Sequence, residues 1–254
     1  MSKIKAIFFD QDGVVIDTEK DGHRVAFNET FKEFGYEFQW DVEKYHELLQ
    51  ISGGKERMRH YFQAEGVFSD LNKDEEDELI KKLHKTKTEI FIKLIERGKL
   101  PLRPGIKRLM KEAMGSGIIL GICTTANERA ANAIARGMLK EINFSFVLAG
   151  DVVSRKKPDP EIYLLALEKT GLKPEECIVI EDSRNGVLAA KEAGMHIIAT
   201  TNVYTERENL SDAGIIVTCL GDPDGEKGLL KKGLENQEFD GIIHADQLVH
   251  YFSK

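Results

Sequence analysis

The sequence predicts an α/β protein in which a core built on a parallel sheet is interrupted by an inserted set of helices. Three observations favour this class. A short apolar run near the start of the chain ends in two closely spaced carboxylates. Residues 17–99 then show helical character without strand-like runs. From residue 106 onward, apolar runs of strand length alternate with helical segments, which is the rhythm of parallel strands joined by right-handed crossovers.

Residues 4–9 are expected to form the first strand, because they are almost continuously apolar, as suits a strand covered on both faces. Asp10 and Asp12 follow this strand. Gly13 permits a sharp turn, so both carboxylates can face one pocket beyond the strand's carboxyl end, where open α/β sheets bind ligands. A calcium loop is the alternative interpretation. It is disfavoured because calcium loops repeat acidic residues and close with Glu, whereas apolar residues 14–16 follow here at once.

The helical part, residues 17–99, is predicted to be a cap domain inserted into the core. Helical patterns are found in four segments: 25–34, 42–49, 56–62 and 74–97. Two prolines and a glycine within residues 100–105 break the pattern and mark the return to the core. The core is therefore expected to comprise residues 1–16 and 100–254.

The second part of the core is predicted to continue the sheet. Strands are expected over residues 118–123, 146–148, 177–180, 196–199 and 215–217, with helices near 106–114, 128–139, 160–170 and 186–193. Residues 239–252 are expected to form a strand or turn followed by a terminal helix. In such a sheet the chemistry should lie at the carboxyl ends of the strands.

At 254 residues and 41% hydrophobic composition, the chain has enough apolar material for a real core. Its net charge of −7 argues against nucleic acid and anionic membranes as partners. No apolar run approaches twenty residues, and the first strand starts close to Met1, so we expect a cytoplasmic protein without a signal peptide. We also expect it to be a monomer. The cysteines at 123, 177 and 219 lack metal-type spacing and are expected to be reduced thiols in the core.

Polar residues follow the later strands as well. Thr124 and Thr125 end the second predicted strand, and Lys157 lies in a Lys-Pro-Asp-Pro sequence. Taken singly, each has a simpler explanation, because hydroxyls cap helices and basic clusters usually face solvent. If the strands end at one edge of a sheet, however, these residues lie together. The threonine hydroxyls, the backbone N–H groups after them and the Lys157 ammonium could then donate to a phosphoryl group.

Two further carboxylates, Glu181 and Asp182, follow the predicted strand 177–180. As an isolated pair they would serve equally well to cap the next helix. In one pocket with Asp10 and Asp12, they would repel each other unless a cation is bound. An all-oxygen set without His or Cys favours Mg²⁺.

In this order the four motifs resemble those of the haloacid dehalogenase superfamily, which has a Rossmann-like core. Its phosphatases use one Asp as the nucleophile and a second Asp, two residues on, as acid and base. The resemblance implies catalytic roles for Asp10, Asp12, Thr124 and Lys157, and contacts to the substrate for Thr125 and Asn127. It implies that Mg²⁺ is held by the side chains of Asp10 and Asp182, by the backbone carbonyl of Asp12, and by Glu181 directly or through water.

The cap resembles the CbbY family of this superfamily. The similarity lies in residues 17–31, 40–45, 53–57, 85–89 and 102–105. Family members are similar to phosphoglycolate phosphatases and β-phosphoglucomutases, and the characterised ones hydrolyse xylulose-1,5-bisphosphate to xylulose 5-phosphate. The resemblance implies that the substrate is bound by Glu19, His23, Tyr45, Gly53, Gly54, Lys55 and Arg57. The residues themselves fit an anionic group, because two glycines let backbone N–H groups approach closely and two cations follow them.

The predicted function is a Mg²⁺-dependent phosphatase that hydrolyses a small phosphorylated sugar, such as xylulose-1,5-bisphosphate, through an aspartyl phosphate. Two related activities share the core motifs: a phosphosugar mutase of the β-phosphoglucomutase kind and a phosphoglycolate-type phosphatase. A catalytically silent binding protein on the same fold is a third class, and it is disfavoured because no catalytic position is substituted. Dehalogenation is disfavoured because that chemistry needs neither magnesium nor the second Asp.

Overall fold

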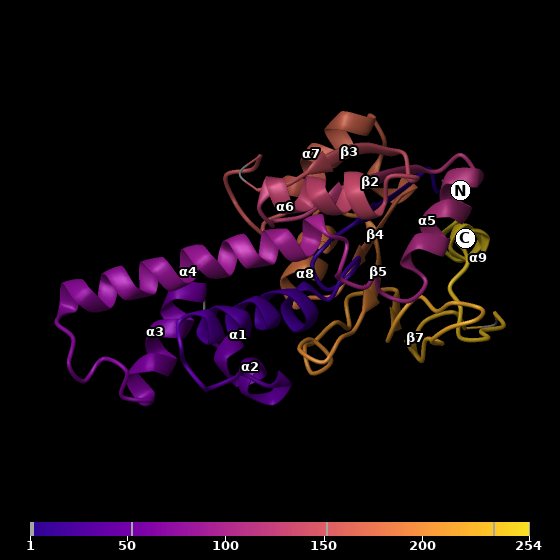
Figure 1. The fold of residues 1–254 in the computed structure, drawn as a ribbon. Helices are drawn as coiled ribbons and strands as arrows, with labels where there is room; N and C mark the ends of the chain where they lie inside the picture. Colours follow the sequence, from indigo (N-terminus) through magenta and orange to yellow (C-terminus); the bar gives the residue numbers. More distant parts are fainter. Residues whose placement is uncertain (1–2, 52, 151, 236, 254) are drawn as a thin grey trace. The chain divides into compact units, whose positions relative to one another are not determined.

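The computed structural model describes residues 3–51, 53–150, 152–235 and 237–253, which form two compact units. The core unit comprises Met1–Asp17 and Pro101–Lys254, and the cap unit comprises Thr18–Leu100. Each junction lies one residue after the predicted one. Figure 1 shows the strands gathered in the core unit and long helices in the cap unit.

The described part of the core unit contains a seven-stranded sheet in the order β3-β2-β1-β4-β5-β6-β7. The strands are β1 (Ala6–Phe9), β2 (Ile119–Cys123), β3 (Phe144–Leu148), β4 (Cys177–Glu181), β5 (His196–Thr200), β6 (Ile215–Val217) and β7 (Leu230–Lys232). All pair in parallel except β7, which is antiparallel to β6. The predicted α/β class and its parallel sheet are confirmed. The edge strand β7 was not predicted, because its three residues are exposed and carry no apolar pattern.

Helices connect the strands of the core unit. They are α5 (Ile106–Gly115), α6 (Glu128–Ala133), α7 (Glu161–Thr170), α8 (Arg184–Glu192) and α9 (Ala245–Phe252), with a π-helical turn η2 (Ile134–Met138) and a 3₁₀ turn η3 (Pro174–Glu176). Alternate residues of β1 point to opposite faces of the sheet. Ala6 and Phe8 pack with residues of α7 and α8, while Ile7 and Phe9 are equally buried, so the strand is covered on both faces. That is why its sequence is continuously apolar.

The cap unit consists of a π-helical turn η1 (Thr18–His23) and four helices, α1 (Arg24–Glu33), α2 (Val42–Leu49), α3 (Gly54–Ala64) and α4 (Lys73–Glu96). Its core is aromatic: the rings of Phe27 and Phe31 each lie 4.8 Å from the ring of Trp40. Asn28 fixes Trp40 by accepting a hydrogen bond from its backbone N–H at 2.8 Å and donating one to its carbonyl at 2.9 Å. None of the described helices is long and apolar enough to cross a membrane.

Arg103, near the start of the second part of the core unit, joins three loops at the carboxyl edge of the sheet. Its guanidinium donates to the carbonyl of Gly13, to that of Thr201 at 2.8 Å and to that of Thr218 at 2.7 Å. Its backbone N–H donates to the carbonyl of Val15 at 2.9 Å. One planar group with several donors thus holds the loop after β1 against the loops after β5 and β6.

We expect Arg103→Lys to lower the free energy of unfolding by about 3 kcal/mol, because a single ammonium cannot reach all three carbonyls and leaves buried acceptors unpaired. Urea unfolding of the metal-free protein measures this, with the same change at exposed Arg207 as the control. The control should stay within about 0.5 kcal/mol of the wild type. Equal stability of the two variants would mean that Arg103 does not hold these loops.

Candidate active site

Lys157 is the centre of a buried group of charged side chains at the carboxyl edge of the sheet. Its Nζ lies 2.6 Å from Oδ1 of Asp10, which follows β1, and 2.6 Å from Oε1 of Glu181, the last residue of β4. It also donates to the carbonyl of Cys123, at the end of β2, at 3.0 Å. The loop between β3 and α7 therefore delivers one cation to the ends of three adjacent strands. These partners raise the pKa of Lys157 against the lowering effect of its burial, so the ammonium form is stable.

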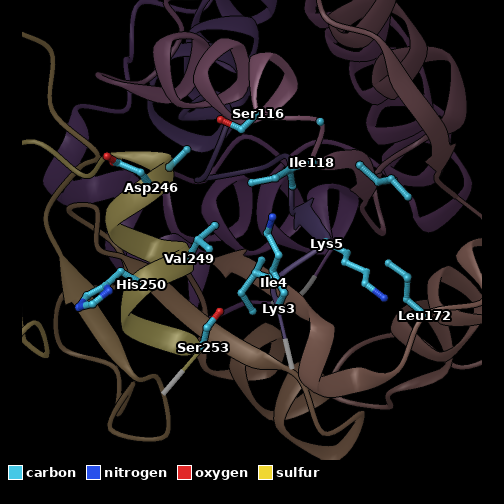
Figure 2. A pocket seen from close by; sticks show the side chains of 13 residues that line it. Lys3, Ile4, Lys5, Ser116, Ile118, Leu172, Asp246, Val249, His250 and Ser253 are labelled. Carbon is cyan, nitrogen blue, oxygen red and sulfur yellow. The ribbon is translucent and has the colours of Figure 1, made fainter. Parts of the chain in front are cut away.

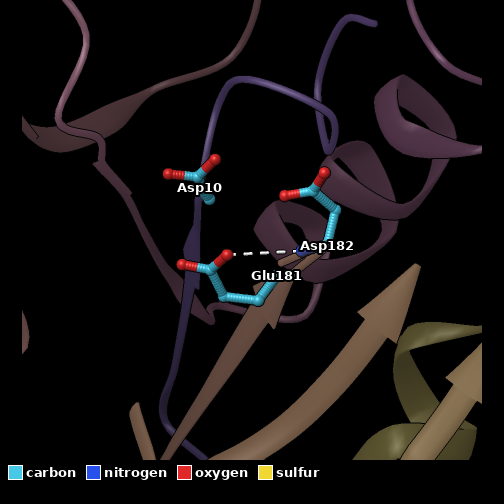
Figure 3. Close-up of side chains that lie close together, drawn as sticks. All are labelled: Asp10, Glu181 and Asp182. Carbon is cyan, nitrogen blue, oxygen red and sulfur yellow. Dashed lines mark hydrogen bonds between the residues drawn. The ribbon is translucent and has the colours of Figure 1, made fainter. Parts of the chain in front are cut away.

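Three carboxylates converge here (Figure 3). One oxygen from each of Asp10, Glu181 and Asp182 lies within 4.8 Å of the others, and all three residues are buried. Burial raises the pKa of Asp10 to about 8; Lys157 opposes the rise, and the charges of Glu181 and Asp12 add to it. Burial also raises the pKa of Asp182 well above its ordinary value, with the charges of Asp10 and Glu181 adding to the rise. Lys157, and the charge of Arg103 that acts on Asp182, do not compensate the four carboxylates of Asp10, Asp12, Glu181 and Asp182. This all-oxygen cluster therefore fits a hard divalent cation.

Glu181 is held on both carboxylate oxygens. Tyr163 of α7 donates its hydroxyl to Oε1 at 2.5 Å, and the backbone N–H of Asp182 donates to Oε2 at 3.3 Å. Gly186 in the first turn of α8 packs against the carboxylate so closely that an added Cβ would lie 1.9 Å from its carbon. Glu181 is thereby fixed where it can pair with Lys157.

The turn after β1 requires a glycine. Gly13 has φ +81°, and a Cβ added to it would lie 2.0 Å from Oδ2 of Asp182. The backbone N–H of Gly13 donates to the carbonyl of Ile16 at 2.7 Å, which closes the turn. Asp12 is half-buried in this turn, close enough for its charge to raise the pKa of Asp10. The structure therefore brings Asp10, Asp12, Lys157, Glu181 and Asp182 together.

The hydroxyl residues after β2 lie at the same edge. Thr124 is buried, and its Oγ1 accepts a hydrogen bond from the backbone N–H of Ala126 at 3.1 Å. Thr125 and Asn127 are exposed. The side chain of Asn127 accepts from the backbone N–H of Arg129 at 2.9 Å and so caps α6. Thr125 is exposed two residues beyond Cys123, the last residue of β2.

In the cap unit, three of the predicted residues form a chain of hydrogen bonds. Tyr45 donates its hydroxyl to Glu19 Oε2 at 2.6 Å and accepts from Arg57 Nη1 at 3.1 Å. Arg57 is buried and also donates to the carbonyls of Leu48 at 3.0 Å and Ile51 at 3.3 Å, at the end of α2. The guanidinium therefore adds a donor to the carbonyl of Leu48, which also accepts from the backbone N–H of Ile51, and holds the chain just after α2.

His23 contacts a buried cation that was not predicted. Lys87 of α4 places its Nζ 2.8 Å from Nδ1 of His23 and 4.6 Å from the centre of the Phe27 ring. Burial lowers the pKa of His23 well below its ordinary value, and the charges of Lys87, Arg57 and His84 lower it further. The imidazole is therefore neutral and accepts at Nδ1 from the lysine.

The predicted glycines begin α3. Gly53 has φ +88°, so a residue with a side chain would be strained there, and Gly54 is the first residue of the helix. Lys55 is exposed in the first turn. The carboxylate of Glu56 lies against Gly53, where an added Cβ would be 2.1 Å from Oε2, so the turn combines a solvent-exposed ammonium with a neighbouring carboxylate.

A cavity of about 1000 Å³ lies elsewhere in the core unit, where the chain enters β1 and β2 (Figure 2). Residues leading into these strands, such as Ile4 and Ile118, line it together with Val249 and His250 of α9. Of the lining residues that the structure describes, Asp246 alone carries a carboxylate. This cavity therefore lacks the group of carboxylates that marks the candidate active site.

A family model of haloacid dehalogenase-like hydrolases matches residues 4–194. The chain belongs to this family. A CBBY-like protein of Arabidopsis thaliana is 48% identical over 226 residues, which cover 87% of this chain and 71% of the relative. A crystal structure of a CbbY mutant from Rhodobacter sphaeroides, in complex with xylulose-(1,5)bisphosphate, has a TM-score of 0.66 and 38% identity over 85% of this chain and 94% of the other.

A phosphorylated carbohydrates phosphatase of Thermotoga maritima is 30% identical over 91% of this chain and 100% of the relative. The predicted membership of the haloacid dehalogenase family, with its similarity to CbbY, is confirmed. The predicted class of enzyme, a phosphoric monoester hydrolase, is confirmed as well.

Sequence reasoning missed four residues that hydrogen-bond to predicted site residues or their turns. They are Tyr163, Lys87, Arg103 and Asn202, whose Nδ2 donates to Asp182 Oδ2 at 2.7 Å. Asn202 carried a usable signal, since it follows the apolar strand β5 just as Asp10 and Asp182 follow β1 and β4. Tyr163 and Lys87 lie inside helices, where a sequence pattern does not reveal a polar partner.

The neutral state of His23 should make the cap unit less stable in acid. A pKa that is lower in the folded than in the unfolded state gives stability that is present above about pH 6.5 and is lost as the pH falls below it, by at most about 1.4 kcal/mol per pH unit. We expect His23→Gln to flatten the stability profile between pH 7 and 5, and the exposed His60→Gln to leave it unchanged. Urea titrations at each pH measure both, and matching slopes in the two variants would contradict the assignment.

Proposed function

We propose that this protein is a magnesium-dependent phosphatase that hydrolyses a sugar phosphate through an aspartyl phosphate on Asp10, and that its substrate is a sugar bisphosphate such as xylulose-1,5-bisphosphate. The observation that carries the proposal is the ion pair of Lys157 with Asp10 inside a buried cluster of carboxylates. Such a carboxylate is fixed in orientation and has a cation beside it, as covalent catalysis at phosphorus requires.

The proposed magnesium site uses the side chains of Asp10 and Asp182, the backbone carbonyl of Asp12, and Glu181 directly or through water. The support is the excess of buried negative charge and the absence of His and Cys from this cluster of described residues. When bound, magnesium supplies positive charge that offsets the carboxylates and the phosphoryl oxygens.

Asp10 forms the bond to phosphorus while the bond from phosphorus to the ester oxygen breaks. Asp12 gives that leaving oxygen a proton, and then takes a proton from the water that attacks the aspartyl phosphate. The second attack breaks the bond between Asp10 and phosphorus and releases inorganic phosphate. Lys157, together with Thr124, Thr125 and Asn127, holds the phosphoryl group through both steps.

The cap residues are proposed to recognise the sugar and the second phosphate. Glu19 and Tyr45 hold each other in one orientation and suit the hydroxyl groups of a sugar. Gly53, Gly54 and the exposed Lys55 suit an anion. His23 is proposed as a further contact to the sugar, and Arg57 to bind through the tyrosine that it orients. The sugar-phosphate relatives support this class of substrate.

A phosphate-release assay over sugar mono- and bisphosphates tests the function. Xylulose-1,5-bisphosphate should yield one equivalent of inorganic phosphate and a stable monophosphate. EDTA should stop the reaction until magnesium is restored, because the carboxylates then repel one another and the substrate. Conversion of β-glucose 1-phosphate to glucose 6-phosphate without stoichiometric release of phosphate would instead favour the mutase. Preferred cleavage of phosphoglycolate would favour a phosphoglycolate-type phosphatase.

Asp10→Asn should lower turnover by more than about 1000-fold, because the amide cannot form the covalent intermediate. The metal-free variant should melt at or above the temperature of the wild type, because burial and the neighbouring carboxylates disfavour the ionised form of Asp10, whose pKa is raised to about 8. The exposed Asp224→Asn is the matched control for both measurements. A variant free of deamidated protein that kept a tenth of the rate would remove Asp10 from the nucleophilic role.

A further inference from the structure

Asn202 lies beside the carboxylate cluster, on the loop that follows β5. Since β5 is the neighbour of β4 in the sheet, the loop after β5 is adjacent to Asp182, which follows β4. The side-chain Nδ2 of Asn202 donates to Oδ2 of Asp182 at 2.7 Å. This contact joins a neutral amide to one oxygen of a buried carboxylate.

The orientation of the amide is fixed from the other side. Oδ1 of Asn202 accepts hydrogen bonds from the backbone N–H groups of Tyr204 at 2.9 Å and Thr205 at 3.1 Å. An amide oxygen accepts and its nitrogen donates. Rotating the group by 180° would therefore set donors against donors in the turn and an oxygen against the Asp182 carboxylate, and all three bonds would be lost. The turn therefore points an N–H donor at Asp182.

Asp182 has little freedom to move away from this donor. Its Oδ2 also lies against the Cα of Gly13, where an added Cβ would be 2.0 Å from that oxygen. The oxygen Oδ2 is thus confined between the turn after β1 and the turn after β5. Fixing one oxygen of a carboxylate also fixes the direction in which the other oxygen, Oδ1, is presented.

We infer that Asn202 is a positioning residue that orients Asp182 to bind the divalent cation. The inference rests on the proposed function, in which Asp182 is a magnesium ligand. Groups that hydrogen-bond a metal ligand typically contribute a factor of about 10 to 100 in metal affinity or activity. Asn202 touches neither the substrate nor the reacting atoms in this role, so its effect should appear in metal binding.

Asn202→Asp is the sharpest test, because it separates the turn from the donor. An aspartate oxygen still accepts from the N–H groups of Tyr204 and Thr205, but the donor to Asp182 is lost and replaced by a like charge. Asn209→Asp is the matched control, since Asn209 accepts from the backbone N–H of Ser211 at 3.1 Å in a similar turn and is exposed. Asn202→Ser is the second variant, because its hydroxyl can accept in the turn without adding charge and is too short to reach Asp182.

Titration calorimetry of the metal-free proteins with MgCl₂ gives the dissociation constant without reference to activity. We expect it to rise by about 10- to 100-fold in both Asn202 variants and to be unchanged in Asn209→Asp. In phosphate-release assays, the magnesium concentration for half-maximal rate should rise in parallel. The rate at saturating magnesium should change less than fivefold.

Three other results of the magnesium titrations would contradict the inference. Wild-type affinity in Asn202→Asp overturns the inference and leaves the proposed magnesium site intact. Weakened binding in Asn202→Asp with wild-type binding in Asn202→Ser assigns the effect to the added charge and also overturns it. A wild-type protein that binds no magnesium overturns the metal site and the inference together.

Discussion

The buried pairing of Lys157 with Asp10 and Glu181 is the interaction on which the rest of the core depends. It exists because β1 and β4 are parallel neighbours whose register places Phe9 beside Ile180, so the next residues of both strands end at the same level. The backbone N–H of Asp10 donates to the carbonyl of Ile180 at 3.0 Å and continues the ladder up to the first carboxylate. The sheet thus brings like charges together. The buried Lys157 compensates part of them, and the proposed Mg²⁺ would compensate more.

Packing carboxylates this closely also explains where the chain needs glycine. Gly13 and Gly186 lie on different turns, yet each faces a carboxylate that leaves no room for a Cβ. At Gly13 the positive φ is a second requirement. Any side chain at either position would push Asp182 or Glu181 out of the cluster. The close packing of the carboxylates therefore determines where the backbone needs a glycine.

The strands that carry the carboxylate cluster, β1 and β4, were predicted from the sequence. Buried parallel strands are apolar along their whole length, so β1 and β4 and the carboxylates at their ends stand out in the sequence. Tyr163 was not predicted, because a tyrosine in the apolar stretch of a helix looks like a packing residue until its hydroxyl is seen 2.5 Å from Glu181. Strand β7 was missed because its three exposed residues have no strand-like apolar pattern. It is recognised as a strand only by its antiparallel pairing with β6.

The polar residues of the cap show a second reason why sequence reasoning stops short. Arg57 and Lys55 look alike as candidate cations for a phosphate, but Arg57 is buried and already donates to Tyr45 and to carbonyls at the end of α2. Lys55 is exposed in the first turn of α3. Because Arg57 is buried and three of its five N–H donors are already used, Lys55 is the better candidate for direct contact with a second phosphate.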